Sequence, residues 1–282
     1  KKCTNCLQIQ ECNVEQLRFL SAKSGEKKAE HYDNSRSESC RSEAALKNET
    51  AELKDFSIRQ LAALCVGYGP GIPFAAFSDT KNPETIFDEQ GNPLTVNDHS
   101  IGTNGYVSPA IPEKGIHSIF YKDGPAGVGT GAWPTEMLIS CSFNKELWKE
   151  FGNAVGGACE KQGVNVWLAP AVNLHRHPLC GRNFEYFSED PYLTGMCAVQ
   201  ITKGVQETHN VCVCPKHFAV NEQETYRRGS AKKNYDAADS ILTERAAREL
   251  YLKPFEMLVQ EAGISFIMTS FNKINGIFCR RK

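Results

Sequence analysis

Polar side chains that could act on a small molecule follow short apolar runs in this 282-residue chain. Lys216 and His217 come directly after the β-prone run Val211–Cys214 and a proline, and Asp123 follows another apolar run. Arg182 lies in a polar loop after a third. Because parallel strands carry functional residues at their carboxyl ends, we expect these four side chains to converge. Four carboxylates lie near them in sequence, namely Glu185, Asp190, Glu222 and Glu224.

A set of Asp, Arg, Lys and His side chains favours a sugar as ligand, because each sugar hydroxyl both donates and accepts hydrogen bonds. Tyr186, Phe187 and Trp133 are predicted to be available for the faces of the sugar ring. A phosphate would favour a glycine loop with free backbone amides, and the sequence has no such loop. The alternative interpretation is that each residue forms an ordinary salt bridge at a strand end.

Hydrolysis of a glycosidic bond normally requires two carboxyl groups. The spacing of the candidate carboxylates does not identify which of them would serve. His175, His177 and His217 could instead hold a metal, but no HExxH or similar spacing accompanies them. Cys3 and Cys6 have the spacing of half a zinc site, and no second CxxC follows. We therefore predict neither a metal nor a cofactor.

Strand-like and helix-like segments alternate along the C-terminal two thirds of the chain. Such alternation, with continuously apolar strands, indicates a parallel sheet covered by helices. No GxGxxG loop supports a doubly wound sheet, so a (β/α)8 barrel of the TIM type is preferred. The strands are predicted at 116–121, 164–172, 211–214 and 264–269, and the helices near 56–65, at 144–162, 191–208 and 243–262, the last kinked at Pro254.

The domain boundaries are predicted from composition. Residues 1–53 carry few large apolar side chains and are expected to form a poorly ordered N-terminal extension. Residues 54–282 are expected to form the barrel domain, and 67–116, rich in Gly, Pro and Asn, to form a pocket wall. Four clear strands are fewer than eight, so we expect an incomplete (β/α)8 barrel.

Composition narrows the partners and the compartment. The 32 basic and 33 acidic residues nearly cancel, so nucleic acid and an anionic membrane are not expected as partners. No run reaches the roughly 18 apolar residues of a membrane span. The N-terminus lacks the apolar core of a signal peptide, and a cytoplasmic location is predicted. The chain has 12 cysteines, and six of them lie in apolar patterns typical of free thiols: Cys65, Cys141, Cys159, Cys197, Cys212 and Cys214.

The ordered motifs GRNFEYFSEDP at 181–191 and KHFAVNEQE at 216–224 resemble the barrel domain of glycoside hydrolase family 3, in its β-glucosidase branch. YKDGPAG at 121–127, LTERAARELYLKPFE at 242–256 and IMTSFNKING at 267–276 extend the similarity. The start of the predicted barrel resembles family members in which an α/β sandwich domain precedes the barrel. In this chain only some 50 residues precede the barrel.

The resemblance implies that Asp123, Arg182, Lys216 and His217 bind the non-reducing-end sugar of a β-glucoside or short β-linked oligosaccharide. Phe271 stands where many members have a tyrosine near the nucleophile. The family's nucleophile is an aspartate on the strand after the one ending at SFNKING, and the acid/base group comes from the sandwich domain. Both are therefore expected to lie outside this chain, and no catalytic residue is assigned within it.

Three hypotheses about function follow. The first is a fragment of a retaining β-glucosidase, weak or inert alone, whose full mechanism is a double displacement. The second is a non-catalytic carbohydrate-binding module, or one in which another chain supplies the missing strands and sandwich domain. The third is the product of a degenerate reading frame, which the basic end Arg280–Lys282 keeps open.

Overall fold

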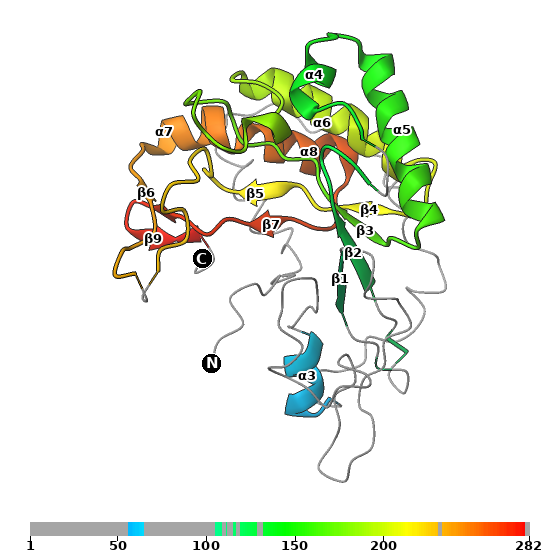
Figure 1. Ribbon diagram of the computed structural model, residues 1–282, viewed down its shortest axis with the longest axis horizontal. Coiled ribbons are helices and arrows are strands. Elements are labelled where there is room, and N and C mark those ends of the chain that lie inside the picture. Colours follow the sequence, from blue (N-terminus) through cyan, green and yellow to red (C-terminus); the bar gives the residue numbers. More distant parts are fainter. Residues whose placement is uncertain are drawn as a thin grey trace, which may run out of the picture.

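The computed structural model describes residues 56–64, 105–108, 111, 115–116, 119–128, 132–230 and 233–279. The predicted N-terminal extension, with Cys3 and Cys6, lies outside these residues, as does most of the predicted pocket wall. Within the described residues, strands lie under a layer of helices (Figure 1). No helix in this part of the chain is long and apolar enough to cross a membrane.

The strands form an arc that is parallel apart from its first member. β1 (Gly105–Ser108) pairs antiparallel with β2 (Ile119–Asp123), and β2 pairs parallel with β3 (Val166–Leu168). β3 pairs parallel with β4 (Cys212–Val213). β5 (Lys216–Phe218) then pairs parallel with β7 (Met268–Thr269). The parallel α/β arrangement predicted from the sequence is therefore present, whereas the described strands form an open arc without barrel closure.

Two prolines shorten the strands relative to the prediction. The strand predicted over 164–172 ends at Leu168, because Pro170 has no backbone N–H to continue the ladder. Pro215 likewise separates β4 from β5, and an isolated parallel bridge between Ala171 and Lys216 continues the pairing of the β3 segment with the chain beyond Pro215. The regular strand pairing is therefore interrupted just before Lys216 and His217.

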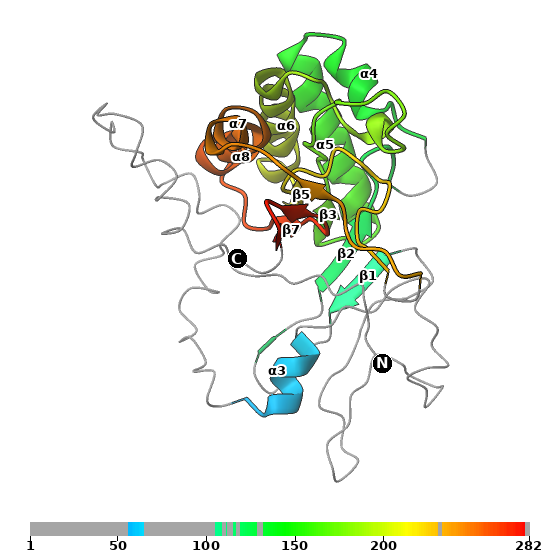
Figure 2. The same cartoon turned by 90° about the vertical axis from the view of Figure 1, so that its left-hand side faces the viewer.

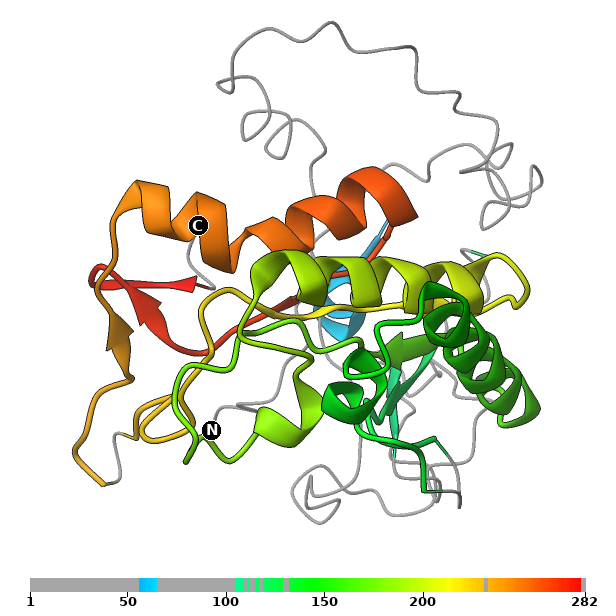
Figure 3. The same cartoon turned by 90° about the horizontal axis from the view of Figure 1, so that it is seen from above.

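Helices cover one face of the arc. α5 (Lys145–Lys161), α6 (Pro191–Gln206) and α8 (Lys253–Ala262) lie on the same side of the strands in two perpendicular views (Figures 1 and 2). Seen from above, α6 lies between α5 and α8 (Figure 3). The remaining helical segments are short: α3 (Ile58–Leu64), α4 (Glu136–Ser140), the 3₁₀ turn η6 (Asn183–Glu185), α7 (Glu244–Ala246) and the π-helical turn η7 (Ala247–Tyr251).

Side-chain alternation along the strands separates two apolar clusters. Phe120, Trp167 and Val213 point to the helices and join the main core. Tyr121 and Val166, on the other face, belong to a second cluster with neighbours from β3 to β7. The strands are thus buried on both faces, as expected for a parallel sheet.

Helix starts are fixed by side-chain caps. Asn144 Oδ1 accepts the Leu147 N–H at 3.1 Å, and Asp190 Oδ1 accepts the Leu193 N–H at 2.6 Å. Asp190, a candidate site carboxylate from the sequence, therefore caps α6. The predicted kink at Pro254 occurs as η7, where the Leu252 N–H donates to the Ala247 carbonyl at 2.8 Å.

A second small sheet follows the arc. It contains β6 (Asp239–Ser240), β8 (Lys273–Ile274) and β9 (Ile277–Phe278). β8 and β9 form a hairpin around Asn275 and Gly276, both with positive φ. This hairpin, within and just after the SFNKING motif, was not predicted from the sequence.

Five of the six cysteines noted in apolar patterns lie within the described residues, and their burial varies. No described cysteine forms a disulfide. Cys159, Cys197 and Cys214 are buried and Cys212 is partly buried, whereas Cys141, just after α4, is exposed.

Candidate functional site

Lys216 and His217 begin β5, which pairs with β7 on one side and with the segment 170–172 on the other. The Lys216 N–H donates to the Pro170 carbonyl at 3.0 Å, and the Val172 N–H donates to the Lys216 carbonyl at 2.7 Å. Both side chains are buried, at 3% and 5% exposure. A lysine and a histidine with this little exposure require specific partners, because burial without them is costly.

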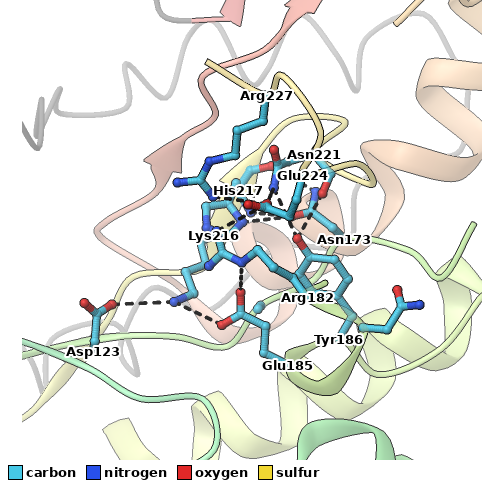
Figure 4. Close-up of polar contacts among 12 residues, drawn as sticks. Asp123, Asn173, Arg182, Glu185, Tyr186, Lys216, His217, Asn221, Glu224 and Arg227 are labelled. Carbon is cyan, nitrogen blue, oxygen red and sulfur yellow. Dashed lines mark hydrogen bonds and ion pairs between the residues drawn. The ribbon is translucent and has the colours of Figure 1, made fainter. Parts of the chain in front are cut away.

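Lys216 has two carboxylate partners, one at a strand end and one in a loop. Its Nζ lies 3.6 Å from Asp123 Oδ1 and 3.5 Å from Glu185 Oε2 (Figure 4). Asp123 is the last residue of β2, and Glu185 ends η6 in the loop after β3. Glu185 is buried and Asp123 is half exposed. The structure therefore places Lys216 between a buried carboxylate and one that faces solvent.

Arg182 extends this contact chain. Its Nε donates to Glu185 Oε1, and its Nη1 lies 3.7 Å from Glu224 Oε1. The same Glu224 oxygen accepts from Arg227 Nη1 at 3.1 Å and from Asn221 Nδ2 at 3.0 Å. Six charges thus alternate in sign across the site: Asp123, Lys216, Glu185, Arg182, Glu224 and Arg227 (Figure 4).

Burial and neighbouring charges fix the protonation of Arg182 and His217. Burial acts to lower the pKa of Arg182, but the charge and the hydrogen bond of Glu185 outweigh it, and the pKa is raised. The pKa of His217 is held well below its usual value, first by burial and then by the charges of Arg182, Lys216 and Arg227. His217 is therefore a neutral imidazole at neutral pH.

Asn173, in the segment after β3, contacts His217 directly. Its Oδ1 accepts the backbone N–H of His217 at 2.8 Å and lies 3.0 Å from the Nδ1 of the ring. Its Nδ2 donates to the His217 carbonyl at 3.1 Å and lies 3.5 Å from Glu222 Oε1. Asn173 was not among the residues predicted for the site.

Two of the three aromatic residues predicted to face a sugar ring are buried and not available for that role. Tyr186 and Phe187 are fully buried. Tyr186 donates its hydroxyl hydrogen to the Asn221 carbonyl at 2.9 Å and accepts from Asn221 Nδ2 at 3.2 Å. Trp133 packs edge-on against Phe151, with 5.8 Å between ring centroids. Tyr186 and Phe187 thus support the loop and the core, and the prediction that they face a sugar ring was wrong. For Trp133, which is only partly buried, it stays a prediction.

Two further carboxyl groups are buried close to the site. Glu136, on α4, accepts the Ala171 N–H at 3.1 and 3.3 Å, and burial, followed by the charge of Glu185, raises its pKa well above the usual value. Burial raises the pKa of Glu222 to about 7. Glu136 was missed, because a lone glutamate in a short amphipathic helix is normally exposed.

The alternative of a metal site made by His175, His177 and His217 is not supported in the described residues. Among the described residues, no three His, Cys, Asp or Glu side chains lie close enough to hold a metal ion. His175 contacts the Asn183 carbonyl through Nε2 at 2.9 Å. Phe271, the position noted for its missing hydroxyl, packs its ring under the Arg227 guanidinium at 5.3 Å.

Comparison with known proteins connects this geometry to a family. The model of the Glycosyl hydrolase family 3 N terminal domain matches residues 114–281, more than half of the chain. Beta-glucosidase A of Butyrivibrio fibrisolvens is 42% identical over 182 residues, which is 62% of this chain and 21% of the relative. Thermostable beta-glucosidase B of Acetivibrio thermocellus is 37% identical over 194 residues, 63% of this chain and 24% of the relative.

A solved β-glucosidase structure is also similar to this chain. Beta-glucosidase 3B of Thermotoga neapolitana, in complex with alpha-D-glucose, superposes with a TM-score of 0.64 and 35% sequence identity. The match covers 80% of this chain and 29% of that chain. This chain thus spans about a fifth of the length of the first curated relative and under a third of the solved structure.

Proposed function

The chain belongs to glycosyl hydrolase family 3, and from this premise we propose that its charged strand ends bind the glycosyl ring of a β-glucoside. The observation that carries the proposal is the alternating chain of charges from Asp123 to Arg227. The names of the relatives and the glucose in the Thermotoga neapolitana structure support the same ligand class.

The chemistry of the four predicted residues suits a polyol. Lys216 and Arg182 only donate hydrogen bonds, whereas Asp123 and the neutral His217 can accept them. Because each sugar hydroxyl donates one hydrogen and accepts others, donors and acceptors must both be present around the ring. Asp123, half exposed, is free on its solvent side to accept from a hydroxyl. That these residues contact sugar is our proposal.

For the reaction, we propose that the site belongs to a retaining O-glycosyl hydrolase acting by double displacement on non-reducing-end β-D-glucosides. Such a reaction requires a nucleophile and an acid/base carboxyl group. In the described residues, Glu185 and Glu224 are bound by cationic side chains that hold them as structural partners. From the family resemblance, we propose that both catalytic carboxylates come from segments other than residues 1–282.

A non-catalytic carbohydrate-binding module, completed by another chain or acting alone, is the second candidate. The observation in its favour is that the proposed binding groups all lie within the part of the chain that the structure describes. Binding and hydrolysis can be measured separately, and the two candidates differ in what happens when a nucleophile-bearing segment and a sandwich domain are supplied. The predicted cytoplasmic location stays a prediction.

The proposal is tested by titrating the 282-residue chain with D-glucose, with D-galactose as the epimer control. We expect saturable glucose binding that is weakened roughly tenfold or more by Lys216→Met, because a hydrogen bond to a charged group contributes about 1.5–3 kcal/mol. Lys149→Met, an exposed lysine on α5, is the matched control.

Hydrolysis is followed in parallel with 4-nitrophenyl β-D-glucoside. The chain alone is expected to give no turnover, and a longer protein carrying the missing carboxylates is expected to cleave the substrate. Absence of saturable glucose binding would contradict the proposed binding site. Turnover by residues 1–282 would instead contradict the assignment of both carboxylates to other segments.

A further inference from the structure

The side chain of Asn173 lies between the backbone of His217 and the carboxyl group of Glu222, all three buried. It makes four polar contacts, two through Oδ1 and two through Nδ2. An asparagine amide can be turned by half a rotation without changing its shape, so its orientation has to be deduced from its partners. For Asn173 the hydrogen-bond partners allow one orientation of the amide.

The backbone of His217 sets that orientation. The backbone N–H of His217 can only donate, so the atom of Asn173 that faces it at 2.8 Å must be the oxygen. The His217 carbonyl can only accept, so the atom facing it at 3.1 Å must be the Nδ2 amide. Both requirements are met by one orientation of the amide, and the reverse orientation would break both hydrogen bonds.

The ring of His217 follows from this orientation. Its Nδ1 lies 3.0 Å from Asn173 Oδ1, which cannot donate, so the Nδ1 must carry the hydrogen. The imidazole is neutral, because burial and the charges of Arg182, Lys216 and Arg227 hold its pKa well below the usual value. A neutral imidazole has one hydrogen, so the Nε2 is left with a free lone pair. Nε2 has no hydrogen-bond partner among the residues that the structure describes.

Glu222 holds the other side of the amide. Its Oε1 accepts the Leu174 N–H at 3.1 Å and lies 3.5 Å from Asn173 Nδ2, so it favours the same orientation. Its Oε2 is buried without a hydrogen-bond partner in the described part of the chain. The charge of Arg176 acts to lower the pKa of this carboxyl group, but burial outweighs it and the pKa is raised.

We propose that Asn173 is a positioning residue that fixes His217 as the Nδ1–H tautomer, so that Nε2 accepts a hydrogen bond from a sugar hydroxyl, and that Glu222 supports Asn173. The part that concerns the sugar rests on the proposed function. With Lys216 and Arg182 as donors, His217 would then add an acceptor next to Lys216 at the same strand end. A hydroxyl bound there donates to His217.

The tautomer is measured by NMR on the full chain labelled with ¹⁵N-histidine, using long-range ¹H–¹⁵N correlations within the rings. His217→Gln identifies the His217 signals by their loss. Near neutral pH we expect a protonated Nδ1 and a bare Nε2 in the absence of sugar. A bare Nδ1 with a protonated Nε2, or a ring protonated on both nitrogens, would overturn the inference whether or not glucose binds.

Two substitutions test the role of Asn173. Asn173→Asp keeps an accepting oxygen, so His217 is expected to retain the Nδ1–H and to have a raised pKa. Asn173→Leu removes the acceptor, so the tautomer preference is expected to be lost and glucose affinity to fall roughly 3- to 10-fold. Asn210→Leu, at an exposed asparagine, is the matched control. If Asn173→Leu does not fold, the wild-type and Asn173→Asp spectra decide the question.

Adding glucose separates this inference from the proposed function. Binding is expected to shift the Nε2 resonance and leave Nδ1 protonated. An unmoved Nε2 with the expected tautomer would contradict sugar binding at His217 while the positioning role of Asn173 stands. Retention of the Nδ1–H tautomer in Asn173→Leu as well as in Asn173→Asp would contradict that positioning role.

Discussion

At the scale of single residues, Glu185 is the side chain that joins two cationic groups of the site, Lys216 and Arg182. Its side chain is buried, accepts from Arg182 Nε and lies 3.5 Å from Lys216 Nζ. Removing its charge would leave a buried lysine with Asp123, 3.6 Å away and half exposed, as its remaining carboxylate partner. Loss of one member of a buried pair is far more costly than loss of a surface pair.

Glu185→Gln is therefore expected to lower the free energy of unfolding by about 3–5 kcal/mol, because Lys216 is left buried without its main counter-charge. Urea unfolding followed by circular dichroism measures the difference. Glu189→Gln, an exposed glutamate four residues away, is the control and is expected to change stability by less than about 0.5 kcal/mol. Equal stability of the two variants would show that Lys216 does not depend on Glu185.

Glu222 makes a prediction about pH. Its pKa is raised from 4.5 to about 7, so between these pH values the folded protein keeps a proton that the unfolded chain has lost. The folded state binds more protons there, and stability falls as pH rises through this window. At about 1.4 kcal/mol per pKa unit, the loss is on the order of 3 kcal/mol.

Glu222→Gln is expected to remove this slope and to be more stable than wild type above about pH 7. The glutamine oxygen still accepts the Leu174 N–H, so the local contacts are kept. Urea unfolding of both proteins across a pH series isolates Glu222, because the other buried titrating groups, Glu136 and His217, are common to both. Identical pH dependence of the two proteins would contradict the assignment.

The sequence was informative about which residues end strands and uninformative about how the loops pack. Asp123 ends β2, as the apolar run before it indicates, whereas Lys216 lies beyond the end of β4 and begins β5. The burial of Tyr186 depends on contacts with Asn221, 35 positions away, which no local pattern indicates. Asn173 was overlooked for the same reason, since its partners His217 and Glu222 are distant in sequence.

At the scale of helices and strands, local signals set the boundaries well. Asn144 caps the start of α5, and Gly163, with a φ of 68°, follows its end. Asn275 and Gly276 carry an equally local signal for a two-residue hairpin, which was overlooked. The short strands were harder to bound, because Pro170 and Pro215 interrupt runs that are apolar throughout.

The crossing of α5 and α6 depends on glycines. A Cβ on Gly152 would lie 2.1 Å from the Ile201 carbonyl oxygen, and one on Gly204 would lie 2.1 Å from the Lys149 carbonyl oxygen. Both obstacles are backbone atoms, which cannot rotate away. The two helices therefore approach each other as closely as they do because neither has a side chain at these positions.

Gly152→Ala is expected to lower the free energy of unfolding by about 1–3 kcal/mol or more, because the helices must separate. Gly157→Ala, on the same helix, is the matched control, since its Cβ would meet only the edge of His209 at 3.4 Å. This control is expected to gain up to about 1 kcal/mol from the higher helix propensity of alanine. Thermal and urea unfolding measure both, and similar effects of the two substitutions would contradict the close crossing.

At the scale of the whole molecule, the proposed binding residues come from three parts of the arc. Asp123 ends β2, Arg182 lies in the loop after β3, and Lys216 begins β5. A ligand that contacts all three is bound only when these strands are in place. Binding and folding of the arc are therefore coupled, although the residues are nearly a hundred positions apart.

D-Glucose is accordingly expected to stabilise the whole chain against unfolding. At a concentration 100 times its dissociation constant, a ligand specific for the folded state adds about 2.7 kcal/mol, and D-galactose, if bound more weakly, adds less. Urea unfolding with and without each sugar measures the increments, and Lys216→Met is expected to lose the glucose increment while Lys149→Met keeps it. A glucose effect equal in both variants and matched by galactose would indicate general solvent exclusion by sugars, and the arc would then have no glycosyl site at Lys216.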